Sequence, residues 1–135
     1  MRTDSDTARL RNVLLLDAGI CTVFGLICVA AAGSIAAATA LPADLIFWAG
    51  LALFPTAAFM AVTALQTPPK RALVWLVLLG NEGWILGSIA ILVFGFVEPN
   101  GLGYAFVIAQ AVAIMPIVLL EYMGAKRLPA APVAA

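Results

Sequence analysis

The sequence has no histidine and few charged residues, and both absences narrow what the protein can do. Without histidine, a His-ligated haem, a His-based metal site and a histidine general base are excluded. Charged residues make up 10% of the 135 positions, whereas a soluble domain carries about 25%. Hydrophobic residues make up 64%, and the mean hydropathy is +1.11. Most of the chain is therefore expected to face lipid or membrane-buried protein.

Cysteine is scarce as well, and its placement argues against a disulfide within the chain. Cys21 and Cys28 lie in one apolar run. Seven helical residues rise by about 10 Å, whereas a disulfide needs Cα atoms within about 7 Å. We expect free thiols that pack as small apolar residues, or thiols that pair with another chain.

Four long apolar runs account for most of the chain and predict an all-α membrane protein. About 20 helical residues cross a bilayer core of roughly 30 Å. The predicted spans cover residues 12–33, 45–65, 72–97 and 102–123. We expect one domain, residues 12–124, folded as a four-transmembrane-helix up-down bundle. Polar tails, 1–11 and 125–135, flank it.

The basic residues predict the topology of this bundle. All seven fall in the N-terminal tail, in the loop between the second and third spans, or at the C-terminal end: Arg2, Arg9, Arg11, Lys70, Arg71, Lys126 and Arg127. The opposite loops carry only Asp44 and Glu98. Four spans place the basic segments on one side, so the positive-inside rule predicts that both termini are cytoplasmic, in the inner (plasma) membrane. A signal peptide cleaved after Ala40 is the alternative for the first run, and it would break this pattern.

Five polar residues inside the predicted spans form the candidate proton or ligand site: Asp17, Asn81, Glu82, Gln110 and Glu121. Glu82 is about 15 Å from the basic start of its span and so lies near the midplane. A carboxylate there costs at least ~2.5 kcal/mol unless it is paired, hydrated or protonated. A polar track is geometrically possible from the basic side, through Glu121 and Asp17, to Asn81, Glu82 and Gln110.

Each of these residues also has a structural interpretation. Asn81 and Gln110 suit hydrogen bonds between helices. Glu121 suits a hydrated position near the terminal cations, and Asp17 suits a protonated or Arg-paired group. For Glu82 we keep three alternatives open: a functional proton, ion or ligand role, a protonated structural group, and contact with a partner chain.

Glycines mark a second face of the third span. Gly80, Gly83 and Gly87 lie away from Glu82, and the last two form a G-x-x-x-G pattern. Small residues at this spacing let helix backbones approach closely. We therefore expect these glycines to pack against a neighbouring helix.

Three segments carry a resemblance to other proteins: LLLDAG (14–19), NEGWILGS (81–88) and the stretch from GLGYAFVIAQA to LEYMG (101–124). They resemble a group of small bacterial inner-membrane proteins of uncharacterised function, over most of the chain. The resemblance implies no activity and no site. The chain differs from small multidrug exporters, which carry an essential Glu in the first helix. It also lacks the C-x-x-C pair of vitamin K epoxide reductase-type enzymes.

These observations lead first to a non-enzymatic accessory or structural membrane protein. We expect no cofactor, no metal and no nucleic-acid partner. The bilayer is the expected partner, together with further copies of the chain or the subunits of a membrane complex. The alternative is a small proton-linked transporter, or a binder of an amphipathic small molecule, that uses Glu82 and Asp17. A membrane redox enzyme based on Cys21 and Cys28 ranks last.

Overall fold

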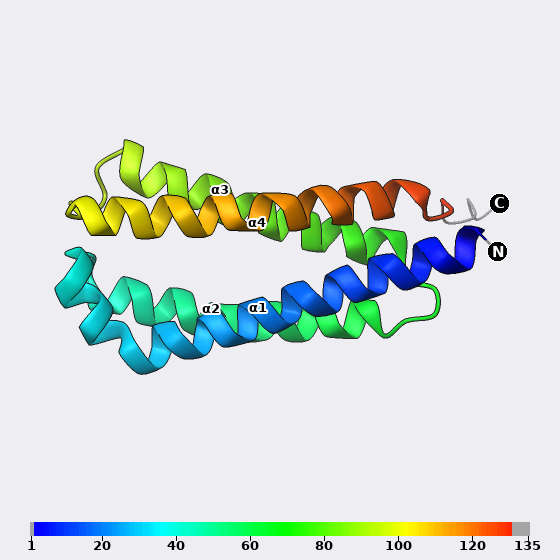
Figure 1. Cartoon of the computed structure of the whole chain (residues 1–135), viewed down its shortest axis with the longest axis horizontal. Coiled ribbons are helices and arrows are strands. Elements are labelled where there is room, and N and C mark those ends of the chain that lie inside the picture. Colours follow the sequence, from blue (N-terminus) through cyan, green and yellow to red (C-terminus); the bar gives the residue numbers. More distant parts are fainter. Residues whose placement is uncertain (1, 131–135) are drawn as a thin grey trace.

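The computed structural model describes residues 2–130 as four α-helices, and the side chains of residues 4–130 (Figure 1). The helices are α1 (Arg2–Thr39), α2 (Ala43–Ala64), α3 (Arg71–Val93) and α4 (Gly101–Arg127). All four are long enough and apolar enough to cross a membrane. The prediction of an all-helical, four-helix membrane-type fold is confirmed at this level.

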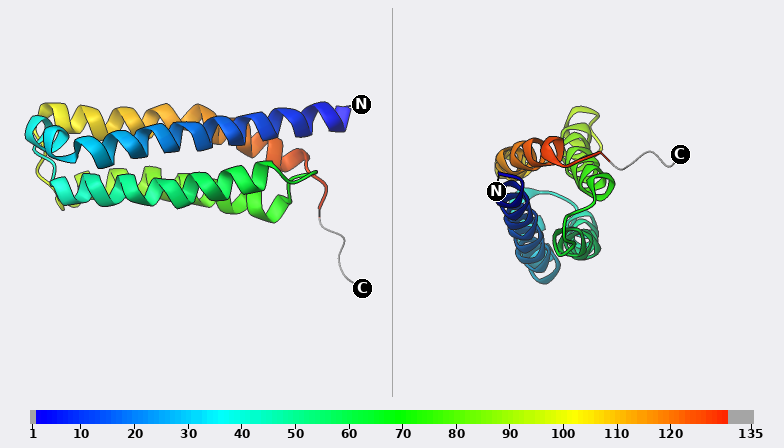
Figure 2. Two further views of the ribbon diagram at one scale, coloured as in Figure 1. Left: turned by 90° about the horizontal axis from the view of Figure 1, so that it is seen from below. Right: turned by 90° about the vertical axis from the view of Figure 1, so that its right-hand side faces the viewer.

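Successive helices run in opposite directions, which gives the bundle two distinct ends (Figure 1). We call the end that holds both termini and the α2–α3 connection the terminal end. The other end, with the α1–α2 and α3–α4 connections, is the far end. Viewed along the bundle, the helices follow one another around the centre in chain order (Figure 2).

Several predicted boundaries differ from the observed ones. α1 begins at Arg2 and continues to Thr39 rather than ending at residue 33, so the predicted polar tail 1–11 is helical from its second residue. α1 contains 38 residues and has a kink at Ala31, where the backbone leaves helical φ/ψ values. About 20 helical residues suffice to cross a bilayer core, so α1 is longer than one crossing requires. α4 continues to Arg127, whereas α3 ends at Val93 rather than at residue 97. Residues 131–135 of the predicted C-terminal tail lie outside the described residues.

At the far end, Asn100 is the N-cap residue of α4 and also contacts α1. Its Oδ1 accepts a hydrogen bond from the backbone N–H of Gly103 at 2.9 Å. Its Nδ2 donates to the carbonyl of Ala38 at 2.8 Å, and its backbone N–H donates to the carbonyl of Thr39 at 3.0 Å. One asparagine thus satisfies groups at the start of α4 and ties the α3–α4 connection to the end of α1.

Close helix approach occurs between α1 and α2 rather than at the predicted glycines. A Cβ built on Gly50 would lie 2.5 Å from Cys28 Cβ and 3.0 Å from the carbonyl oxygen of Gly25. By contrast, a Cβ on any of the three predicted packing glycines would meet nothing within 4 Å: Gly80, Gly83 and Gly87. Their prediction as helix-packing residues is therefore wrong within this chain. Their face of α3 borders open volume, because α2 and α3 diverge.

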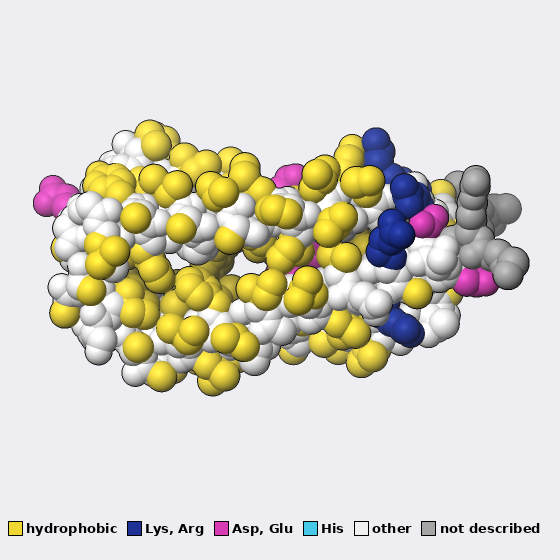
Figure 3. All heavy atoms as spheres, in the orientation of Figure 1, with side chains coloured by type: hydrophobic (Ala, Val, Ile, Leu, Met, Phe, Trp, Pro, Cys, Tyr) yellow, Lys and Arg dark blue, Asp and Glu magenta, His cyan; other side chains and the backbone are white. Residues whose placement is uncertain are grey.

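The two ends differ in packing. Near the terminal end, Leu10, Leu14 and Val74 are at most 2% exposed, and Arg127 forms an ion pair of 2.8 Å with Asp6. Toward the far end, the space-filling view shows a hollow between the α1–α2 pair and the α3–α4 pair (Figure 3). Figure 3 also shows Lys and Arg side chains gathered toward the terminal end. The candidate site lies where the packed half meets the hollow one.

Candidate functional site

Three helices bring together a buried group that we call the carboxyl–amide cluster: Asp17 of α1, Asn81 of α3 and Glu121 of α4. Asp17 and Glu121 are 0% exposed and Asn81 is 3% exposed. In α1, Asp17 shares the inward face with Cys21 and Cys28, four and eleven residues on, as the helical repeat of 3.6 requires. Each polar side chain thus lies on the inward stripe of its own helix.

The amide of Asn81 links the two acids. Its Nδ2 donates to Asp17 Oδ2 at 2.8 Å and to Glu121 Oε2 at 3.0 Å. An amide nitrogen carries two hydrogens, so both are used on carboxyl oxygens. Cys21 Sγ makes a longer contact of 3.8 Å to Asp17 Oδ1. Asn81 is therefore the shared donor of the cluster.

The two carboxyl groups are also close to each other, since Asp17 Oδ2 and Glu121 Oε2 accept hydrogen bonds from the same amide nitrogen. Glu121 Oε1 is buried without any hydrogen-bond partner. Two ionised carboxylates are both acceptors and cannot bond to each other. A proton on one of them would remove the repulsion between two neighbouring charges, as in other pairs of carboxyls that share a site. The arrangement is thus suited to holding one proton on the pair.

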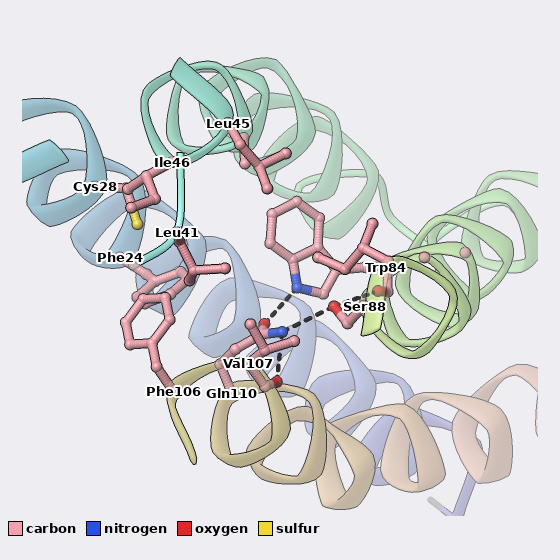
Figure 4. Close-up of a pocket in the computed structure, with 14 residues that line it drawn as sticks. Phe24, Cys28, Leu41, Leu45, Ile46, Trp84, Ser88, Phe106, Val107 and Gln110 are labelled. Atoms are coloured by element: carbon pink, nitrogen blue, oxygen red, sulfur yellow. Dashed lines mark hydrogen bonds between the residues drawn. The ribbon is translucent and has the colours of Figure 1, made fainter. Parts of the chain in front are cut away.

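A second polar network lies nearer the far end, and it is neutral (Figure 4). Trp84 Nε1 donates to Gln110 Oε1, which joins α3 to α4. Gln110 Nε2 donates to Ser88 Oγ at 2.8 Å and to the carbonyl of Val107 at 3.0 Å. Ser88 in turn donates to the carbonyl of Trp84 at 2.8 Å. The side chains of this network therefore supply one another's hydrogen-bond partners, and none of them is charged.

Two cavities of about 270 Å³ each follow one another along the bundle. The inner chamber is bordered at its terminal-end side by Asp17 and Asn81, and it is also lined by Ile20, Cys21, Leu53, Thr56, Gly80, Ala113, Ile114 and Ile117. The outer chamber continues toward the far end and is lined by Cys28, Leu41, Leu45, Ile46, Ala49, Gly83, Gly87, Ser88, Ile91, Phe106 and Val107. Phe24, Trp84 and Gln110 border both chambers and form a neck between them.

The structure divides the five predicted site residues into three places. Asp17, Asn81 and Glu121 meet in the cluster, and Gln110 belongs to the neck. Glu82 is exposed on α3, away from both. Adjacent helical residues point about 100° apart, so Asn81 and Glu82 cannot both face the interior.

The sequence named Glu121 as a candidate, but its structural interpretation was wrong. A hydrated position beside the terminal cations was expected, whereas the side chain is fully buried. Its place on one stripe of α4 with Gly103 and Gln110 was the available signal. The close contact between α1 and α4, where Gly124 faces Leu10, removes it from solvent. Phe24 borders both chambers but was not predicted as a site residue, because an apolar side chain in an apolar span does not stand out in the sequence.

The described residues contain no group of three or more His, Cys, Asp or Glu side chains that could hold a metal ion. Comparisons of the chain with protein-family models, with curated proteins and with solved structures gave no match. The resemblance to small bacterial inner-membrane proteins therefore remains an expectation, and function has to be argued from the site.

Proposed function

We propose that the chain is a multi-pass plasma-membrane protein with both termini in the cytoplasm, and that it binds a small molecule in its interior in exchange for a proton. The orientation rests on charge: all seven Lys and Arg residues belong to segments of the terminal end, whereas Asp44 and Glu98 lie at the far end. The exchange rests on the carboxyl–amide cluster and on its position at the inner chamber.

The observation that carries this proposal is the placement of two fully buried acids on one amide nitrogen. Hydrogen bonds between membrane helices need only neutral groups, as the Gln110 network demonstrates. Ionisable groups within the bilayer are costly and mark proton and substrate pathways. The unpartnered Glu121 Oε1 adds to the cost of a purely structural cluster. Amide side chains at positions 17 and 121 would stabilise the helix contacts more than acids do. A carboxyl pair that gains and loses a proton explains why acids occupy these positions.

The position of Asp17 links the proton to a ligand. Asp17 and Asn81 border the inner chamber, whereas Glu121 lies behind them. A ligand in the chamber would therefore meet the acid that shares the proton. Ligand and proton then compete for one carboxyl pair, which is the minimum requirement for coupling the two.

Infrared spectroscopy of the purified protein tests this proposal. We expect a carbonyl band from a protonated carboxyl group that shifts in frequency in Asp17→Asn and in Glu121→Gln. Sharing needs both acids, so either substitution leaves one buried acid that holds its proton alone, with different hydrogen-bond partners. Glu82→Gln is the matched control and should keep the band. The wild-type band should also shift when H₂O is replaced by D₂O, since a coupling proton must exchange with water.

A second candidate is the accessory subunit of a membrane complex, and the exposure of Glu82 favours it. Glu82 lies on the outer surface of α3, where Leu79 and Leu86 are 61% and 65% exposed. An acid on such an apolar face suits contact with a partner helix. The infrared experiment separates the candidates: a band lost only in Glu82→Gln, or a cluster band that never exchanges with D₂O, would replace the proton-linked function with this one.

A further inference from the structure

The structure points to a ligand class: an amphipathic molecule with a cationic head at Asp17 and an apolar body in the neck and outer chamber. This inference rests on the proposed function, because it assigns the molecule that competes with the proton. It is carried by the order of the two chambers and by the single sign of charge that lines them.

The charge of the chamber lining favours a cationic head group on the ligand. Among the residues that line the two chambers, the one ionisable acid is Asp17, and none is Lys or Arg. The hydroxyl of Thr56 is already engaged, since it donates to the carbonyl of Ala52 at 2.9 Å. An anionic head would meet no cation in this space and would be repelled by the carboxyl pair. A cation would offset the charge left on the pair when the proton departs.

The lining of the neck and the outer chamber favours an apolar body on the ligand. Phe24 and Phe106 lie with their ring centroids 5.9 Å apart on one side, and Trp84 faces the same space from α3 (Figure 4). Ser88 and Gln110 are the polar side chains here, and they bond to each other. The remaining lining is aliphatic or glycine, apart from the thiol of Cys28. A cation that passes the neck meets aromatic rings, which attract cations through their faces, and its apolar body displaces no hydrogen bond.

The hollow gives such a molecule a route from lipid. It opens between the α1–α2 and α3–α4 pairs in the half toward the far end (Figure 3). Gly83 and Gly87 line the outer chamber on α3, and a Cβ at either would meet nothing within 4 Å. These glycines therefore keep volume free instead of drawing helices together. A Cβ at either position would narrow the chamber without a clash.

A pair of isosteric probes tests the inference on the full chain in lipid nanodiscs. Benzyltrimethylammonium carries the cation, and neopentylbenzene has the same shape with carbon in place of nitrogen. Calorimetry, with empty nanodiscs subtracted, should give the cation a Kd at least tenfold lower than that of the neutral isostere. Asp17→Asn should remove this preference. Equal Kd values for the two probes in the wild type would overturn the inference, because the chambers would then be an apolar or lipid-chain site.

Filling the outer chamber gives an independent test. Gly83→Leu should raise the Kd of the cation at least tenfold, whereas Gly19→Leu should leave it unchanged. Gly19 is the matched control, because it also faces open space on a helix and lines neither chamber. Thermal unfolding establishes that both variants are folded. Unaltered binding by folded Gly83→Leu would contradict the assignment. A wild-type protein that keeps the exchangeable cluster band but does not prefer the cation would refute this inference alone and leave the proposed function standing.

Discussion

From the terminal end to the level of Asp17, the helices exclude solvent: Leu14, Val74 and Glu121 are each 0% exposed. From Asp17 to the far end, the same helices border two cavities of about 270 Å³ each. The interior of the packed half contains Asp17 and Glu121, whereas the polar side chains that line the neck and the outer chamber are neutral and bond to one another. This difference shows two roles for the packing. Close packing keeps solvent away from Asp17 and Glu121. In the cavities, the polar side chains already have hydrogen-bond partners, so the space that they line is mostly apolar.

The largest expected effect comes from forcing apart the helices that are in closest contact. Gly50→Leu should lower the free energy of unfolding by about 3 kcal/mol, because even its Cβ would overlap Cys28. Gly83→Leu is the matched control and should change stability by less than ~1 kcal/mol, with the gain in helix propensity favouring the variant. Unfolding in mixed micelles with increasing dodecyl sulfate measures both. Equal losses would mean that α3 is packed as closely as α2, and the contrast between the halves would disappear.

A smaller effect compares the two polar networks directly. Asn81→Leu removes the donor shared by two buried acids and should cost about 2 kcal/mol. Gln110→Leu leaves only neutral groups unpaired and should cost about 0.6 kcal/mol. The same unfolding assay applies to both. A larger loss at Gln110 than at Asn81 would contradict the view that charge is concentrated in the packed half.

The sequence was sufficient for the helices and for most polar residues of the site. Hydropathy predicted the four helices, and polar residues inside the predicted spans singled out Asp17, Gln110 and Glu121. It could not decide between Asn81 and Glu82, since neighbours on one helix differ by about 100° and either could face inward. Nor could it show that Gly25 and Gly50, rather than Gly83 and Gly87, stand at the helix contact. That depends on which faces cross, a property of the assembled bundle.

The central claim is that a cation reaching the inner chamber displaces the proton of the packed half. The most direct measurement is the infrared difference spectrum of the wild-type protein on addition of benzyltrimethylammonium. The account predicts that the protonated-carboxyl band assigned to Asp17 and Glu121 decreases as the cation binds, and that neopentylbenzene leaves the band unchanged. A band that stays constant while the cation is bound would contradict the claim, because proton and ligand would then occupy the protein independently.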